Sequence, residues 1–429
     1  MSVEELRARI VTLDSEIERQ KNLLEKLEND RILTLRQLNA ALDPVARLPL
    51  EISSEIFLQS LTWGAQHAPT LLLKICSAWA DIALTTPALW TSVHIHFPCD
   101  DDVAKVLPIW FERTRGRPLS ISISTCGFSY NWNHRVFDVL WRHGGQLKHF
   151  EIVLLMGNDE LGTYHPVDLF AKTTPLSLPL LETVTIRCQL PKRGYLEHWI
   201  LDLLRRAPNI VEVVLDNVTA LEDSGAQMLV VPTLRRLMFG DTTETDDEIL
   251  RALALPALEA LSLPMRYISG DNLMAFIERS AAPLQDLALG WEYNILQSAQ
   301  LHDCLRLIPT LTRFKMWHPS SEVIAELFTA LADSPSLLPN LHNLTIHILD
   351  MDHSPAEISY VSWRTLVRAL STRRVEHLYI VSVEVSPPTD VLASLRELIA
   401  HGASIHVGIE EANFLVEWLS NENQDQRGC

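Results

Sequence analysis

The 429-residue chain lacks the features of secreted, membrane-spanning or nucleic-acid-binding proteins. Its six cysteines lie far apart without a C-x-x-C pair, which predicts reduced thiols and neither disulfides nor a zinc site. No basic-then-apolar leader and no apolar run of eighteen residues occurs. The 36 Lys and Arg against 54 Asp and Glu give a net charge of −18, whereas phosphate binding needs a basic surface. We therefore expect a cytoplasmic or nuclear protein that binds neither membranes nor nucleic acid.

Catalytic motifs are also missing from the sequence. No G-x-S-x-G, H-E-x-x-H, P-loop or G-x-G-x-x-G occurs. His94 and His96 would face the same way on a strand, but no third ligand has a supporting spacing, which favours ordinary strand histidines. We expect no enzymatic activity, no cofactor and no metal. An enzyme whose site is built from loops stays open as an alternative, because catalytic triads assemble only in three dimensions.

What the chain does contain begins with a helical pattern over residues 1–42. This segment has no Gly or Pro, and Gln20, Arg31 and Thr34 are its polar interruptions. Its apolar residues follow alternating steps of three and four: Leu6, Ile10, Leu13, Ile17, Leu24, Leu27 and Leu38. Such a heptad is typical of a coiled coil and predicts a homodimer through residues 1–42. The alternative is an amphipathic helix that folds back on its own protein.

Residues 43–95 have the pattern of a small helical domain. The Leu48-Pro49 turn opens a helix, because proline is tolerated where the first backbone N–H has no helical partner. Ile52, Ile56 and Phe57 fall on one face at helical spacing. A second helix carries Leu72, Ile75, Cys76 and Trp79, and Pro87 ends it before Leu89 and Trp90. So small a domain is marginal alone, so we expect it to dock against a partner.

This segment resembles an F-box, the adaptor-binding module of cullin-RING ubiquitin ligases. The matching positions are Leu48-Pro49, Glu51-Ile52, Ile56-Phe57, Ile75-Cys76-x-x-Trp79 and Pro87-x-Leu89-Trp90. Ser77-Ala78 departs from the pattern, since many members carry basic residues before the Trp. The resemblance implies binding to a Skp-type adaptor, and through it to a cullin, by Leu48, Pro49, Ile52, Ile56, Phe57, Ile75, Cys76 and Trp79. The alternative is a helical hairpin that caps whatever follows.

A block of the form L-x-x-L-x-L recurs after about residue 100. Nine blocks, 24 to 34 residues apart, begin at Leu147, Leu181, Ile210, Leu234, Leu258, Leu284, Leu311, Leu341 and Val375. Two irregular blocks lie at Gly116 and near Ile405. We expect each block to be a strand followed by a covering helix, as at Tyr195–Arg206, Asp246–Ala254, Gly270–Ser280, Glu322–Ala332 and Trp363–Ser371.

This α/β pattern resembles the leucine-rich repeats that often follow an F-box. It predicts a leucine-rich-repeat-like solenoid over residues 96–420 and a polar tail over residues 421–429. A doubly wound sheet or a barrel is the alternative. On a solenoid, the strand residues between the inward apolar ones would face the concave side. These are Arg187, Arg236, Arg313, Lys315, Trp317, His347, His377 and Tyr379.

The last six of these residues are the predicted target-binding surface. A basic and aromatic surface on an acidic protein would suit an acidic or phosphorylated peptide. The alternative is that these side chains are merely polar and that a loop covers Trp317.

Taken together, the patterns predict a substrate-recognition subunit of a Skp-cullin-F-box type ubiquitin ligase. The F-box would dock to the adaptor, and the repeats would hold a target protein near the ubiquitin-charged enzyme, which raises its effective concentration. The alternative is a non-catalytic scaffold that assembles through the coiled coil and has no role in a ubiquitin ligase.

Overall fold

The computed structural model describes most of the chain and divides it into two compact units. Unit one comprises residues 1–94 and 105–119, and unit two comprises residues 95–104 and 120–429. The described residues are 3–62, 69–126, 133–155, 177–188, 193–216, 218–221, 227–240, 247–264, 268–290, 298–348, 358–373, 375–383, 385–409 and 412–415. The polar tail expected over residues 421–429 lies outside them.

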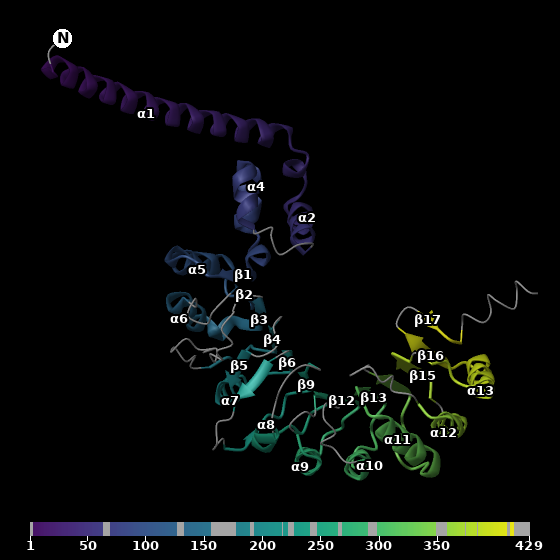
Figure 1. The fold of residues 1–429 in the computed structure, drawn as a ribbon. Helices are drawn as coiled ribbons and strands as arrows, with labels where there is room; N and C mark the ends of the chain where they lie inside the picture. Colours follow the sequence, from purple (N-terminus) through teal and green to yellow (C-terminus); the bar gives the residue numbers. More distant parts are fainter. Residues whose placement is uncertain are drawn as a thin grey trace, which may run out of the picture. The chain divides into compact units, whose positions relative to one another are not determined.

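Unit one is helical, as the sequence predicts. Its elements are α1 (Val3–Leu42), η1 (Val45–Arg47), α2 (Leu50–Thr62), η2 (Pro69–Leu71), α3 (Leu72–Ile75), α4 (Ser77–Thr85) and η3 (Pro87–Trp90). Figure 1 labels α1, α2 and α4 among them. The Pro49 carbonyl accepts the backbone N–H of Ile52 and of Ser53, so α2 begins where the Leu48-Pro49 turn predicted. Cys76 is extended, and its Sγ accepts the Trp79 N–H at 3.4 Å, which starts α4. Helix α4 ends at Thr85, two residues before Pro87.

A small apolar core holds unit one together around the fully buried Trp90. Its buried members are Phe57, Leu72, Ala83, Leu89 and Trp90. The Trp90 indole N–H donates to the Ala83 carbonyl at 2.8 Å. Trp110, from the later helix α5 (Asp101–Arg113), donates to the Trp90 carbonyl at 2.8 Å and stacks edge-on against its ring. Unit one therefore uses residues beyond the predicted boundary at 95.

The main sheet has thirteen strands in the order β1-β2-β3-β4-β6-β9-β11-β12-β13-β14-β15-β16-β17. They are β1 (Ser92–Phe97), β2 (Leu119–Cys126), β3 (Leu147–Leu155), β4 (Thr183–Cys188), β6 (Glu212–Asp216), β9 (Arg236–Phe239), β11 (Ala260–Leu263), β12 (Asp286–Gly290), β13 (Arg313–Trp317), β14 (Asn343–His347), β15 (His377–Val381), β16 (Ser404–Ile409) and β17 (Ala412–Asn413). Neighbours from β3 to β16 pair parallel, and β17 pairs antiparallel. Strands β1 and β17 are its edges, so this sheet does not close into a barrel.

Every predicted block contains a strand of this sheet. From the second block to the ninth, the strand starts two residues after the block does, as for Leu311 and β13. The two irregular blocks are β2 and β16. The fourth and sixth residues of each block are buried, for example Phe314 and Met316. Arg313, the third residue of the same block, is exposed. The period of two therefore turns one face of each strand inward.

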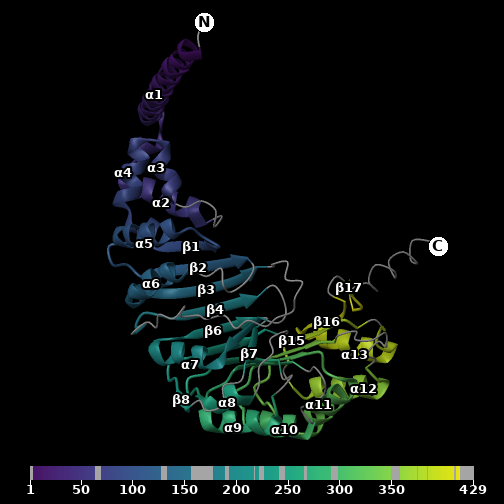
Figure 2. The ribbon, with the colours of Figure 1, turned by 60° about the vertical axis from the view of Figure 1, so that its left-hand side comes forward.

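Helices of unit two follow the strands and lie along one side of them (Figure 2). They are α6 (His134–Arg142), α7 (Glu197–Arg206), α8 (Asp247–Ala252), α9 (Gly270–Ser280), α10 (Ser298–Arg306), α11 (Ser321–Asp333), α12 (Tyr360–Ser371) and α13 (Thr389–Ala400). The serine hydroxyls of Ser269, Ser320 and Ser359 cap α9, α11 and α12. The five expected helices are present, although two of them are shorter than predicted.

Short strands replace the missing turns of those two helices. Tyr195 belongs to β5 (Arg193–Leu196), which pairs with β7 (Val218–Leu221). Leu253 and Ala254 form β10 (Leu253–Ala254), which pairs with β8 (Leu229–Val230). Both are separate two-stranded sheets.

The same polar contact recurs in the loops that precede the strands. Asn209 donates to the Pro179 carbonyl at 2.7 Å, and Asn340 donates to the Pro309 carbonyl at 2.9 Å. The hydroxyls of Thr233 and Thr310 donate in the same way to carbonyls of Pro208 and Leu284, at 2.9 and 2.7 Å. Each bond joins one strand-entry loop to the loop before it, so neighbouring blocks are connected by equivalent contacts.

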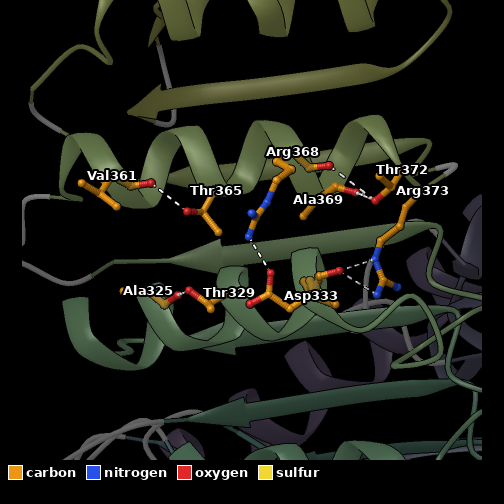
Figure 3. A network of polar contacts seen from close by, with 10 residues as sticks. Ala325, Thr329, Asp333, Val361, Thr365, Arg368, Ala369, Thr372 and Arg373 are labelled. Atoms are coloured by element: carbon orange, nitrogen blue, oxygen red, sulfur yellow. Dashed lines mark hydrogen bonds and ion pairs between the residues drawn. The ribbon is translucent and has the colours of Figure 1, made fainter.

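Arginines brace neighbouring helices at their C-terminal ends, where backbone carbonyls have no helical partner. Figure 3 shows Arg368 of α12 directed at Asp333 of α11, 2.6 Å away, and Arg373 reaching the last turn of α11. Arg279 of α9 donates to the Leu253 and Leu250 carbonyls at 3.0 and 2.5 Å. Burial lowers the pKa of Arg373.

Candidate protein-binding surfaces

Helix α2 presents isoleucines to solvent and buries a serine. The exposed fractions are 51% for Ile52 and 42% for Ile56, one helical turn apart on the same face. Ser53 is fully buried, and its hydroxyl donates to the Val45 carbonyl at 2.9 Å. This inverts the usual pattern of an isolated helical domain, where the apolar side chains face the core.

Two further predicted adaptor contacts of unit one are exposed. Leu48, which directly precedes it, is 42% exposed, and Ile75, the last residue of α3, is 37% exposed. Pro49 is exposed as well. Sequence reasoning missed three other exposed leucines of residues 43–95, Leu50, Leu71 and Leu84. We call Leu48, Ile52, Ile56 and Ile75 the apolar docking surface.

The other predicted adaptor contacts are internal. Phe57 is 2% exposed and Cys76 is 1% exposed, so neither side chain is available to a partner. Trp79 is half-buried, its ring centroid lies 4.8 Å from that of Phe57, and its indole N–H donates to the Asp43 carboxylate. The prediction that Phe57 shares a face with Ile52 and Ile56 is wrong, because Phe57 faces the core and the two isoleucines face solvent. Phe57 and Cys76 are therefore interior residues of unit one, and Trp79 packs against Phe57.

The predicted target-binding residues lie on one face of three neighbouring strands. In the register of the sheet, Arg313 of β13 pairs with Asn343 of β14, which pairs with His377 of β15. The next row on this face runs from Lys315 through Thr345 to Tyr379, and the row after it joins Trp317 to His347. The buried residues of the same strands alternate with them. The structure thus brings all six residues together.

Aromatic rings connect this surface across the strands. The Lys315 ammonium lies 5.0 Å from the centroid of the Trp317 ring, a cation–π contact worth about 0.5–1 kcal/mol at such sites. The Tyr379 ring lies 6.1 Å from that of His347 and 4.5 Å from that of His406. Sequence reasoning missed His406, although it occupies in the irregular block of β16 the position that Tyr379 has in β15.

Acidic neighbours offset much of the positive charge on this face. Arg313 forms an ion pair with Asp286 of β12 at 3.0 Å. The other two arginines predicted to face the concave side also form ion pairs, Arg236 with Glu212 at 3.3 Å and Arg187 with Glu151 at 4.0 Å. The surface is therefore mixed in charge and aromatic, and less basic than the sequence predicted.

The described residues contain neither a metal-binding cluster nor a membrane-spanning helix. No group of three or more His, Cys, Asp and Glu side chains in that part of the chain is arranged to hold a metal ion. None of its helices combines the length and the apolar character needed to cross a membrane. His96 instead lies 2.9 Å from the Ser124 hydroxyl, through Nδ1.

Comparisons with known proteins add little to this description. No protein-family model matches the chain. No curated protein matches it either. Among solved structures, it is similar to a protein from Bacteroides fragilis determined by a structural genomics consortium, with a TM-score of 0.33, 12% sequence identity and 73% of each chain covered. A likeness at that TM-score carries no argument about function, so the proposals below depend on the geometry of the two surfaces.

Proposed function

We propose that the chain is a substrate-recognition subunit of a Skp-cullin-F-box type ubiquitin ligase. The observation that carries the proposal is the apolar docking surface, in which Ile52 and Ile56 face solvent while Ser53 is buried on the same helix. Completing the burial of a large aliphatic side chain contributes up to about 1.5–3 kcal/mol. Four such side chains supply a reason for this domain to bind a protein partner, and a Skp-type adaptor is the partner that the F-box resemblance implies.

Unit two, in this proposal, is a leucine-rich-repeat-like solenoid that holds the target. Parallel strands in sequence order, a helix after most strands and the repeated loop contacts at Asn209, Thr233, Thr310 and Asn340 support it. Repeats of this kind bury a continuous core only by stacking on their neighbours. The target would bind the face that carries Trp317 and Tyr379, because exposed aromatic and charged side chains together are typical of binding hot spots.

The chain would act by proximity in the cytoplasm or nucleus and contribute no catalytic residue. Bound to the adaptor and through it to a cullin, it would raise the concentration of target lysines near the ubiquitin thioester. The mixed charge of the surface favours a target segment with both acidic and apolar residues, because Arg313 is already paired with Asp286.

Co-purification with a Skp-type adaptor tests the proposal. We expect a stable complex with the wild-type chain and at least about 100-fold weaker binding for Ile52→Glu/Ile56→Glu, since both glutamates would have to be desolvated at the interface. Ile109→Glu is the matched control, because Ile109 is an isoleucine of unit one that is 52% exposed outside the docking surface. Circular dichroism checks that all three chains are folded. Specific complexes of this kind are populated at about 10 µM of each protein. If the folded wild-type chain elutes without the adaptor at that concentration, the ligase proposal is refuted and the scaffold alternative is favoured.

A further inference from the structure

Helix α1 has an apolar stripe that nothing in the described structure covers. Every side chain from Val3 to Leu35 is exposed, so this part of the helix does not fold back on its own protein. Leu6 is 43% exposed and Ile10 is 57% exposed. Helices in proteins gain most of their stability from packing an apolar face, which favours a partner for the stripe of this 40-residue helix.

The choice of residues along the stripe favours two parallel strands. With Ile10 at heptad position a, the a positions are Val3, Ile10, Ile17 and Leu24, and the d positions are Leu6, Leu13, Gln20 and Leu27. β-Branched residues at a with leucine at d favour parallel dimers over trimers and tetramers. The seam is therefore best defined over residues 3–27, before Arg31 and Thr34 interrupt it.

Charges beside the seam are complementary in a parallel dimer. In a parallel dimer in register, a g residue meets the e residue five positions later in the second copy. Arg9 then meets Asp14, and Glu16 meets Lys21, so both fully charged g–e pairs along the helix are attractive. Glu16 also accepts hydrogen bonds from Arg19 and Gln20 of its own helix, which lower its pKa and keep it ionised.

Antiparallel dimers bring g against g and e against e. Aligning the apolar layers over the whole helix places Glu16 opposite Asp30 and Asp14 opposite Glu28. Aligning them over residues 3–27 alone places Glu16 opposite Glu16 and Asp14 opposite Asp14. These two antiparallel registers juxtapose like charges. The register between them pairs Arg9 with Asp30 and Asp14 with Lys21, but it places Leu6 opposite Arg31 within the seam. The parallel register combines opposite charges with apolar layers at both Leu6 and Ile10.

We propose that residues 3–27 form a parallel, in-register coiled coil with a second copy of this chain. The inference does not depend on the proposed ligase role. If both hold, each assembly carries two docking surfaces and two target-binding faces, so that a target with two binding segments would be held by avidity.

Two cysteine variants of the full chain test the orientation. Leu6→Cys places a thiol at a d position, where the two copies of a parallel dimer approach within disulfide reach. Ala8→Cys is the matched control, at an outward f position two residues away. We expect a disulfide-linked dimer on mild oxidation of Leu6→Cys only, with the wild-type chain giving the background from native thiols. In the antiparallel register over residues 3–27, Leu6 would lie opposite Leu24 and about 27 Å from its own counterpart, at 1.5 Å of rise per residue.

The mass of the assembly and a charge-reversal variant at Glu16 complete the experiment. Light scattering should give twice the 48.6 kDa of one chain. Glu16→Lys should weaken the dimer about tenfold, because two attractive pairs become repulsive, and Glu16→Lys/Lys21→Glu should restore it. A wild-type monomer at 10 µM, where specific dimers are populated, would overturn the proposal and assign the stripe to another protein. So would equal cross-linking of both cysteine variants, or tighter association of Glu16→Lys.

Discussion

Arg373 should contribute far more to stability than Arg368, although both join α12 to α11 (Figure 3). The Arg373 guanidinium is half-buried and donates five hydrogen bonds to four carbonyls, those of Leu331, Ser334, Leu337 and Leu338, at 2.6–3.2 Å. The Leu331 carbonyl lies in the last turn of α11, where no helical N–H follows, and the other three carbonyls lie just after the helix. Those of Ser334 and Leu338 also accept the backbone N–H groups of Leu337 and Leu341. Arg373→Ala removes the guanidinium from all four carbonyls and leaves those of Leu331 and Leu337 without a side-chain donor.

The expected cost is about 3 kcal/mol. A hydrogen bond from a charged donor contributes about 1.5–3 kcal/mol, but bonds from one side chain are not additive and solvent can reach part of this site. The ion pair of Arg368 with Asp333 is different, because the two side chains are 58% and 60% exposed. An exposed pair of this kind contributes less than about 1 kcal/mol.

Hydrogen exchange measures this difference locally. Arg373→Ala should raise the exchange of α11 and α12 amides about 100-fold, and Arg368→Ala should raise it less than about fivefold. Arg373→Lys should fall between them, since lysine keeps the charge but cannot bridge four carbonyls. Equal effects of the two alanine substitutions would refute the assignment of Arg373 as the bridge.

Three further outcomes follow from the described contacts. Phe57→Ala should destabilise unit one by about 3–5 kcal/mol, which faster hydrogen exchange in α2 and α4 would reveal; unchanged exchange would show that Phe57 is not a core residue. Gly290→Ala should lower the free energy of unfolding in denaturant by about 1–3 kcal/mol, because its Cβ would lie 2.9 Å from the Pro264 carbonyl oxygen. The control Gly145→Ala meets no atom within 4 Å and should leave stability unchanged, so equal effects of the two substitutions would contradict this reasoning. Burial, and to a lesser extent the nearby Lys148, lowers the pKa of His149. The free energy of unfolding should therefore fall as the pH drops below the ordinary histidine value of about 6.5, because protonation then favours the unfolded chain. His149→Gln should flatten this dependence of unfolding free energy on pH, and an unchanged dependence would count against the assignment.

The sheet could be predicted from the sequence because one physical rule repeats along it. An apolar residue at the first, fourth and sixth positions of each block specifies a strand with one buried face, and eight strands begin at the same offset within their blocks. The two small sheets could not be predicted. Leu253 and Ala254 continue an apolar helical pattern, and only their pairing with Leu229 and Val230 makes them a strand.

The docking surface was predictable in composition and not in orientation. Ile52, Ile56 and Phe57 are all apolar at helical spacing, and the sequence gives no reason for Phe57 alone to face inward. The buried hydroxyl of Ser53 decides it, because its bond to the Val45 carbonyl turns that side of α2 toward the core. Likewise, the spacing of strands found Arg313 but not its partner Asp286, which lies 27 residues earlier on the neighbouring strand.

Calorimetric titration of the chain with a Skp-type adaptor tests the central claim most directly. We predict one adaptor per chain and a negative change in heat capacity, because covering Leu48, Ile52, Ile56 and Ile75 removes apolar surface from water. Ile52→Glu/Ile56→Glu should abolish the heat of binding, and Ile109→Glu should leave it unchanged. A wild-type chain that releases no heat and forms no complex would contradict the account of the apolar docking surface as an adaptor site.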